Sequence, residues 1–282
     1  MWQSYESRTK VFAEGSGGPS HTTSNPGFEA STTRTELGFS FAFADHWTLD
    51  LGLSYVDIRL ENSTNPQDVT TERVSGFGDT ALIVRRVIVD VEPAPEDEST
   101  SSSGGNKVAE APRSGTRMAF GLGVSLPTGE PERPIAAGPV ANSTLQTGTG
   151  TFDPLLTASL MHDFSSWSAF SHAILRIPGG ENRYDYRTGA ALQVSVGGSR
   201  ALGDRWSISP RITYLWRASD RIDGEAAFAS GGEWLSVVPA LELELFERSH
   251  LEILAEIPLW RDLRTDQLDS TMRFAAGFTT RW

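Results

Sequence analysis

Apolar and polar residues alternate along most of this chain with a period of two, and no other sequence feature limits the possible folds as much. Successive side chains of a β-strand point to opposite faces, so the alternation predicts strands with one apolar face and one polar face. In the clearest example, segment 117–126, the apolar face would carry Met118, Phe120, Leu122, Val124 and Leu126. A helix would scatter these side chains around its circumference, so the pattern favours a strand.

About twelve segments show the alternation, at roughly 1–12, 33–44, 47–60, 74–90, 115–127, 151–162, 167–177, 184–200, 206–217, 233–246, 250–258 and 269–282. No stretch has the periodicity of a long amphipathic helix, so the predicted fold class is all-β. Tight connections such as Ala44-Asp45-His46 and Gly203-Asp204-Arg205 alternate with longer Gly-, Pro-, Ser- and Thr-rich loops. Short periplasmic turns and longer extracellular loops are typical of a transmembrane antiparallel β-barrel.

The segment 91–113 departs from this arrangement. It is acidic and of low complexity, with Glu96-Asp97-Glu98 followed by a run of Ser and Gly, and we expect a flexible insertion on the short-turn side. The sequence otherwise predicts a single barrel domain over residues 1–282.

Composition excludes several classes of protein. The absence of cysteine excludes disulfide scaffolds, thiolate metal sites and cysteine nucleophiles. The net charge of −12 argues against a nucleic-acid partner, which needs a basic face. No apolar run approaches the roughly 20 residues of a membrane helix. No signal peptide is visible after Met1, which would fit either a cytosolic protein or a mature chain with an added initiator Met.

A soluble β-propeller or sandwich would also contain many short strands. The alternating segments here run to about 11–14 residues, enough to cross a bilayer at a tilt, whereas ordinary strands have about 5–6. Their polar faces also carry more charges than a dry core could hold, while the lumen of a membrane barrel is polar.

The candidate functional site is therefore the lumen wall. The predicted lumen-lining residues are Glu36, Asp50, Asp79, Arg117, Asp153, Arg187, Arg211, Glu242, Glu244, Glu256 and Arg273. One interpretation is a charge-lined passage that orients polar or anionic solutes. The other is that opposite charges pair across the lumen and brace or plug it. The two interpretations are compatible if a constriction remains open.

The tryptophans are expected to mark the membrane interfaces. Trp47, Trp167 and Trp206 each follow a tight turn, where an interfacial aromatic ring would need them. The full predicted girdle contains Trp47, Trp167, Trp206, Trp216, Trp234, Trp260 and Trp282. The last strand ends on an aromatic residue, Trp282, which resembles the signal that the barrel-assembly machinery recognises. The predicted partners are therefore this machinery and outer-membrane lipid.

A series of motifs carries a family resemblance. In chain order these are Ser75-Gly76-Phe77-Gly78-Asp79, Gly121 to Gly129 with Pro127-Thr128-Gly129, Gly148 to Pro154, Tyr186-Arg187-Thr188-Gly189, Ala201 to Trp206, and Glu256-Ile257-Pro258-Leu259. Their order and spacing resemble the outer-membrane β-barrel family named after the phenol meta-cleavage degradation pathway. The resemblance covers most of residues 33–282 and implies a porin-like channel or transporter for small organic solutes, including aromatic or hydrophobic ones. The motifs also have a mechanical interpretation, since Pro and Gly end strands and start loops.

Two other function classes were weighed. A barrel enzyme of the outer-membrane lipase type would need a Ser–His pair, but Ser171 and His172 are adjacent on a strand and face opposite ways. Ser168 shares the face of His172 but lies about 13 Å away by strand rise. No catalytic residue, metal site or cofactor is therefore predicted. A structural or adhesive barrel without transport is the third class.

Overall fold

The computed structural model describes residues 7–16, 28–65, 68–91, 115–130, 146–227, 230–246, 249–264 and 272–281. Every regular element in these residues is a β-strand, as the alternation predicted. The described residues contain no helix that is long and apolar enough to cross a membrane. The acidic insertion predicted at 91–113 lies outside the described residues except for its first residue, Val91, which ends a strand.

The strands form one large antiparallel sheet and one small one. In the large sheet lie β1 (Ser7–Ser16), β2 (Phe28–Ala44), β3 (Trp47–Asn65), β4 (Asp68–Phe77), β5 (Thr80–Val91), β6 (Gly115–Leu126), β7 (Asp153–Asp163), β8 (Ser168–Arg176), β10 (Ala191–Leu202), β11 (Trp206–Ile208), β12 (Arg211–Arg217), β15 (Gly232–Val238), β16 (Ala240–Phe246), β17 (Ser249–Leu263) and β18 (Arg273–Arg281). The small sheet contains β9 (Tyr186–Arg187), β13 (Arg221–Ile222) and β14 (Glu225–Ala226).

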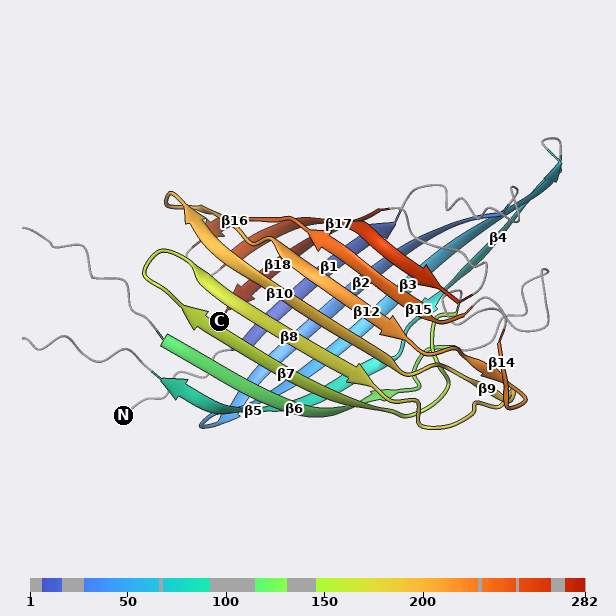
Figure 1. Cartoon of the computed structure of the whole chain (residues 1–282), viewed down its shortest axis with the longest axis horizontal. Coiled ribbons are helices and arrows are strands. Elements are labelled where there is room, and N and C mark those ends of the chain that lie inside the picture. Colours follow the sequence, from blue (N-terminus) through green and yellow to red (C-terminus); the bar gives the residue numbers. More distant parts are fainter. Residues whose placement is uncertain are drawn as a thin grey trace, which may run out of the picture.

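The large sheet closes on itself. Neighbours in sequence pair antiparallel around the wall, and β1 also pairs with β18, so that Val11 lies opposite Phe278. The 15 strands of this sheet reduce to twelve wall strands when β4/β5, β11/β12 and β15/β16 are each counted as one interrupted strand. The result is a barrel of tilted strands, seen from the side in Figure 1.

The two interruptions in the second half of the wall occur at proline. Pro210 separates β11 from β12, and Pro239 separates β15 from β16, although the alternation predicted continuous strands over 206–217 and 233–246. Proline has no N–H to donate to the sheet, so the hydrogen-bonded ladder breaks at these positions. Both halves still pair with the same neighbouring wall strands, and the barrel continues across each break.

The two ends of the barrel differ. At the left of Figure 1 lie the tight turns after β2, β7 and β10, and at the right lie the longer connections and the small sheet. The hairpin of β3 and β4 extends well beyond this long-loop end. The largest fully buried side chains are Tyr186, Ile58, Val56, Asp153 and Asp220. Two of these, Asp153 and Asp220, and Tyr186, which hydrogen-bonds Asp220, make polar contacts at the long-loop end.

Candidate functional site

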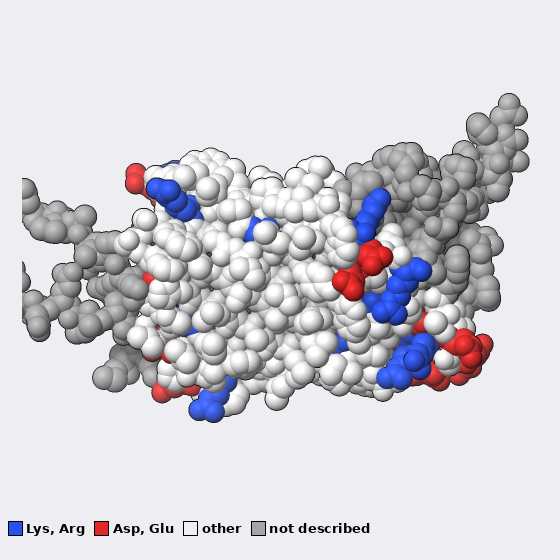
Figure 2. Space-filling model, in the orientation of Figure 1, with Lys and Arg blue, Asp and Glu red and all other residues white. Residues whose placement is uncertain are grey.

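The inner and outer faces of the wall follow from side-chain contacts on β2 and β3. Phe39, Phe41 and Phe43 are exposed on one face of β2, with Phe41 exposed to 49%. On the other face, the Ser40 hydroxyl donates to Asp50 Oδ1 of β3 at 2.6 Å. The apolar face is the outer one, and Figure 2 shows that charged side chains on the viewed surface gather at the two ends of the barrel, with a largely uncharged band between. This confirms the alternating apolar-out, polar-in pattern.

Charged residues on the inner face form ion pairs along the wall. Arg85 of β5 donates from Nη2 to Asp50 Oδ1 of β3 at 2.7 Å and also hydrogen-bonds Oδ2 through Nε. Further inner-face pairs, at N–O distances of 3.4–3.7 Å, are Arg117–Asp90, Arg211–Glu252, Arg273–Glu256 and Arg34–Glu36. Most of these pairs join adjacent strands, and Arg34–Glu36 lies within one strand. Arg211–Glu252 joins two strands that have one other strand between them. Each of these pairs therefore joins neighbouring parts of the wall.

The structure places most of the predicted lumen residues on the inner face. By strand alternation the inner-face set contains Glu36, Asp50, Arg117, Asp153, Arg211, Glu242, Glu244, Glu256 and Arg273. Asp79 lies instead in the break between β4 and β5. Arg187 also lies outside the wall, in the small sheet, where it is paired with Arg221.

The placement of Arg187 corrects the prediction of one strand over 184–200. The wall strand β10 begins only at Ala191, because residues 188–190 bend to meet a loop residue, Asp220. The Gly189 N–H donates to Asp220 Oδ1 at 2.7 Å, and the Tyr186 hydroxyl donates to Asp220 Oδ2. A side chain at Gly189 would also meet the Ala218 carbonyl oxygen, so the chain approaches this loop too closely for a continued strand.

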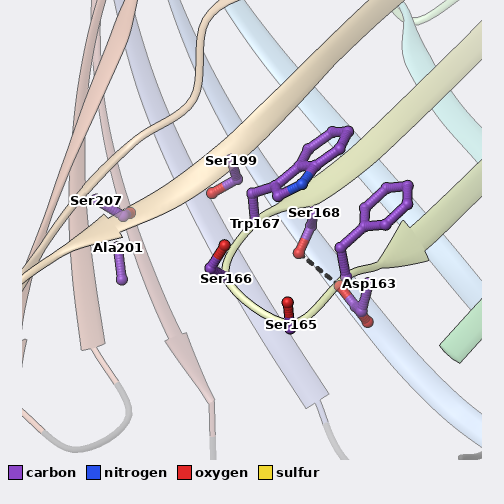
Figure 3. A pocket seen from close by; sticks show the side chains of 9 residues that line it. Asp163, Ser165, Ser166, Trp167, Ser168, Ser199, Ala201 and Ser207 are labelled. Carbon is purple, nitrogen blue, oxygen red and sulfur yellow. Dashed lines mark hydrogen bonds between the residues drawn. The ribbon is translucent and has the colours of Figure 1, made fainter. Parts of the chain in front are cut away.

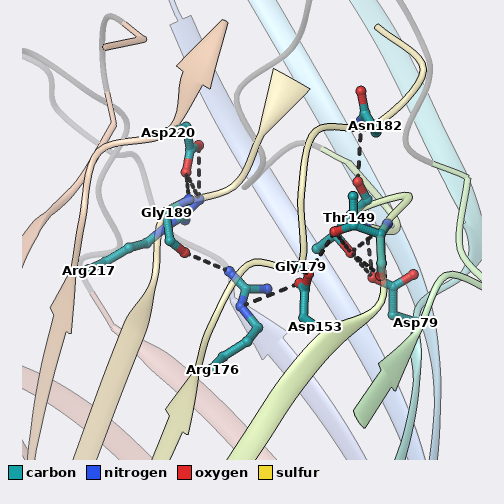
Figure 4. A network of polar contacts seen from close by, with 10 residues as sticks. Asp79, Thr149, Asp153, Arg176, Gly179, Asn182, Gly189, Arg217 and Asp220 are labelled. Carbon is teal, nitrogen blue, oxygen red and sulfur yellow. Dashed lines mark hydrogen bonds and ion pairs between the residues drawn. The ribbon is translucent and has the colours of Figure 1, made fainter. Parts of the chain in front are cut away.

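A polar network joins the long-loop connections to the wall, and we call Asp79, Thr149, Asp153, Arg176, Arg217 and Asp220 the loop-end network (Figure 4). Asp79 Oδ2 accepts from the backbone N–H of Thr149 at 2.7 Å and from its hydroxyl at 2.8 Å. Asp79 Oδ1 accepts from the Gly129 N–H at 3.1 Å. Burial raises the pKa of the Asp79 carboxyl, although these donors oppose the rise.

The second half of the loop-end network contains two arginines. Asp153 is fully buried and accepts from the Thr151 hydroxyl at 2.6 Å and from the Gly179 N–H at 3.0 Å. Arg176 donates from Nη2 to the Gly189 carbonyl at 3.3 Å, and its Nε lies 4.0 Å from Asp153 Oδ2. Arg217 donates from Nη2 to both oxygens of Asp220, at 2.9 and 3.0 Å.

Sequence reasoning missed Asp220. Asp220 lies in a loop without periodicity, and its partner Tyr186 is 34 residues away in the chain. The only local signal was the motif Tyr186-Arg187-Thr188-Gly189, which had been noted for its family resemblance. Its Tyr and Gly are the two residues that bind Asp220.

The structure describes six of the seven tryptophans predicted as an interfacial girdle. Trp47, Trp167 and Trp206 are exposed at the short-turn end, and Trp260 is exposed toward the other end. Trp216 lies opposite Leu192 on the outer face. Trp282 lies outside the described residues.

Trp234 does not belong to the girdle. It lies opposite Leu215 of β12, one residue away from the outward-facing Leu235, and this alternation puts it on the inner face. The prediction had relied on its position near the long loops and not on its alternation within β15. Trp234 is therefore a residue of the lumen wall.

A cavity of about 450 Å³ lies at the short-turn end, between the β7–β8 turn and strands β10 and β11 (Figure 3). Asp163, Ser168, Ser199 and Ser207 line it, and the Ser168 hydroxyl donates to Asp163 Oδ1 at 2.5 Å. Phe164 and Trp167 stack with ring centroids 4.0 Å apart, so these two rings close one side of the cavity. The cavity is an open recess at the short-turn end, lined by both polar and apolar side chains.

His172, weighed earlier as a catalytic residue, faces the lumen. Its neighbours across the two adjacent strands are Ser159 of β7 and Ser195 of β10. The sequence alone did not predict these neighbours. The row continues through Thr213 and Ser236, so it holds hydroxyl groups and one imidazole. Within the described residues, no group of three or more His, Asp or Glu side chains could hold a metal ion.

Comparison with known proteins shows which family and which solved structures this chain resembles. A family model described as "Putative MetA-pathway of phenol degradation" matches residues 15–234. The crystal structure of an outer-membrane channel from Pseudomonas putida F1 is similar over 100% of this chain and 97% of that chain, with a TM-score of 0.68 and 14% identity. This likeness shows the fold, an outer-membrane β-barrel.

Two more distant structures have TM-scores below 0.5. The translocator domain of the autotransporter NalP from Neisseria meningitidis has a TM-score of 0.44 at 6% identity, covering 99% of this chain and 88% of that chain. The monoaromatic hydrocarbon channel CymD has a TM-score of 0.42 at 8% identity, covering 100% and 89%. No curated protein sequence matches this chain.

Proposed function

Because the chain belongs to the family of the MetA pathway of phenol degradation, we propose that it is a porin-like outer-membrane channel for small organic solutes, including aromatic ones. The observation that carries the proposal is the arrangement of the inner-face charges. Opposite charges pair between neighbouring parts of the wall, as Asp50 does with Arg85. A polar, wall-braced interior is suited to the passage of small solutes.

The fold supports the same proposal. The Pseudomonas putida protein of this fold is an outer-membrane channel, and it matches over nearly its whole length. The exposed outer rows, such as Leu122 at 69%, offer the apolar surface that outer-membrane lipid would cover. The closing strand β18 would carry the recognition signal for the barrel-assembly machinery.

Planar-bilayer recording of the refolded full chain tests the proposal. We expect stepwise conductance in KCl from protein whose folded barrel migrates differently on gels before and after heating. Liposome swelling with neutral aromatic solutes and with sugars of increasing size would then define the solute range. A folded, heat-modifiable barrel with neither conductance nor swelling would contradict the channel and leave a structural or adhesive role.

An enzyme role is tested separately. His172 lies between Ser159 and Ser195, so the wild type and the His172→Ala variant are compared in a phospholipid hydrolysis assay. We expect neither protein to hydrolyse lipid. Hydrolysis by the wild type that disappears in the variant would replace the channel proposal with the lipase-type one.

A further inference from the structure

The inner face of β7, β8, β10, β12 and β15 is layered in rows that run across the strands. The first row, nearest the long loops, contains Leu155, Arg176, Ala191, Arg217 and Gly232. The second row contains Thr157, Ile174, Gln193, Leu215 and Trp234. Consecutive rows are two residues apart, or roughly 6.7 Å along a strand. A cationic row therefore lies directly beside a row that is mainly apolar.

In the first row, Arg176 and Arg217 are separated only by Ala191. Their backbones are two strand spacings apart, roughly 9.6 Å, so long side chains from both can reach one small solute group. The short side chain of Ala191 leaves the inner surface open between them. Arg176 and Arg217 are still partly exposed, at 28% and 15% of their side-chain surface.

Both guanidinium groups have hydrogen-bonding capacity left over. A guanidinium offers five N–H donors. All the hydrogen bonds of Arg217 to Asp220 run from Nη2, and Arg176 donates from Nη2 to Gly189. The Nε atoms of both arginines, and the hydroxyl of Thr157 in the second row, are themselves buried and have no hydrogen-bond partner within the described part of the chain.

The neighbouring carboxylates use up only part of this capacity. Asp153 Oδ1 accepts from Thr151 and Gly179, whereas Asp153 Oδ2 has no hydrogen-bond partner among the described residues and lies 4.0 Å from Arg176 Nε. Asp220 accepts from Tyr186, Gly189 and Arg217. Asp79 accepts from Thr149 and Gly129. These three acidic side chains nevertheless offset the two positive charges, so an anion bound here would be held weakly. Weak binding is what a passage needs, because a solute must also leave.

The ring of Trp234 lies next to the arginine row. An ideal Cβ at Gly232 would be 3.2 Å from the indole atom Cη2, so the indole extends from the second row over Gly232 of the first row. Gly232 has a φ of 150°, a conformation that disfavours a side chain at this position. The indole, Leu215 and Ile174 together give an apolar surface beside the guanidinium groups.

We propose that Arg176, Arg217 and Trp234 form a binding site for small aromatic carboxylates within the channel. The carboxylate of the solute sits between the two guanidinium groups, and its ring lies on the indole and the apolar second row. The row spacing suits a solute whose ring is joined directly to its carboxylate. The inference deepens the proposed channel function and rests on it.

Competition between simple solutes tests the proposal. Benzoate, acetate and benzyl alcohol are titrated into the refolded protein, with ion-current block in planar bilayers and quenching of tryptophan fluorescence as readouts. We expect saturable benzoate binding in roughly the millimolar range, and at least tenfold weaker effects of acetate, which lacks the ring, and of benzyl alcohol, which lacks the charge. Equal binding of benzoate and benzyl alcohol would overturn the role of the arginines, and equal binding of benzoate and acetate would overturn that of the indole.

Variants locate the site. Arg176→Gln and Arg217→Gln should each weaken benzoate binding about tenfold, the effect expected for one lost charge-assisted hydrogen bond. The matched control is Arg200→Gln, because Arg200 is an exposed arginine of β10 that alternation puts on the outer face. If a glutamine variant does not fold, the lysine variant keeps the charge and should show a smaller loss. Trp234→Leu should weaken benzoate and benzyl alcohol alike.

The outcomes separate the two proposals. Unchanged benzoate affinity in both folded arginine variants would overturn the aromatic-carboxylate site while leaving the channel intact, provided conductance in KCl persists. Loss of conductance in the wild type itself would overturn the channel. If the wild type does not conduct, fluorescence quenching by benzoate in the wild type and in the arginine variants would still show whether the arginines bind benzoate.

Discussion

Asp50 and Arg85 face each other on the inner side of the barrel, joined by hydrogen bonds from Nε and Nη2 to the two carboxylate oxygens. Arg85 is also packed against Gly121 of the next strand, where an added Cβ would lie 2.7 Å from Arg85 Cγ. The pair is therefore held in place from two neighbouring strands.

We expect Asp50→Asn and Arg85→Gln each to lower the free energy of unfolding by about 1 kcal/mol, since both side chains are partly exposed to a wet lumen. A double-mutant cycle by urea unfolding in lipid vesicles measures the coupling between them. Additive losses would show that the ion pair contributes nothing to stability.

Gly123 is predicted to be intolerant of any side chain. An ideal Cβ there would lie 2.4 Å from the Leu82 carbonyl oxygen, which is backbone and cannot rotate away. Gly123→Ala should destabilise the barrel by roughly 1–3 kcal/mol. Gly180→Ala is the control, because no atom lies within 4 Å of its added Cβ, and it should be nearly neutral. Equal stability of the two variants in vesicle unfolding would contradict this packing.

Asp79 should give the barrel a measurable pH dependence. Burial raises the pKa of Asp79 above the ordinary 3.8, because the buried site favours the protonated carboxyl. The contribution of Asp79 to the free energy of unfolding is therefore fully present at low pH and is lost as the pH rises through the raised pKa. The free energy of unfolding of the wild type minus that of Asp79→Asn should therefore fall between pH 3 and neutrality. A difference that rises with pH would mean that the Thr149 and Gly129 donors outweigh burial.

The contribution of Asp57 to stability should depend on pH in the opposite direction to that of Asp79. Asp57 lies on the β3–β4 hairpin, and hydrogen bonds from Arg73, with the arginine's charge, lower its pKa below 3.8. Its contribution is present above that ordinary value and is lost as the pH falls through the lowered pKa. Hydrogen exchange of the hairpin amides in wild type and Asp57→Asn should therefore converge at low pH. A variant difference that persists unchanged at low pH would exclude the ion pair as its cause.

Trp206 and Trp234 should respond differently to the bilayer. Trp206 is exposed on the outer face at the short-turn end, whereas Trp234 faces the lumen. In vesicles of brominated lipid, Trp206→Phe should remove a strongly quenched component of the fluorescence, and Trp234→Phe should remove a component that lipid does not quench. Strong lipid quenching of Trp234 would restore it to the interfacial girdle.

The alternation of side chains was enough to predict the all-β class and the inward direction of residues such as Asp50 and Arg211. It succeeded because lipid and a wet lumen impose opposite demands on the two faces of every strand. It failed at Arg187, because Asp220 draws residues 188–190 out of the strand. Interactions between distant loop residues leave no periodic trace in a sequence.

Pairing between strands also decided which residues share a site. The sequence placed Arg176 and Arg217 in different strands, and only the register across Ala191 shows that they lie in one row. Trp234 was assigned to the membrane interface because its distance from a loop was considered without its alternation. The register between two strands depends on cross-strand packing and on loop length. The alternation of residues along one strand does not specify it.

The pairing of β1 with β18 also has a consequence for how the molecule can be made. Val11 and Phe278 meet across the seam, so the last ladder to form joins the two extremes of the chain. Until both are present, every intermediate has two open sheet edges, and such edges have no partners in lipid. Closure therefore needs both β1 and β18, and loss of either strand should leave an open sheet that cannot insert stably rather than a smaller barrel.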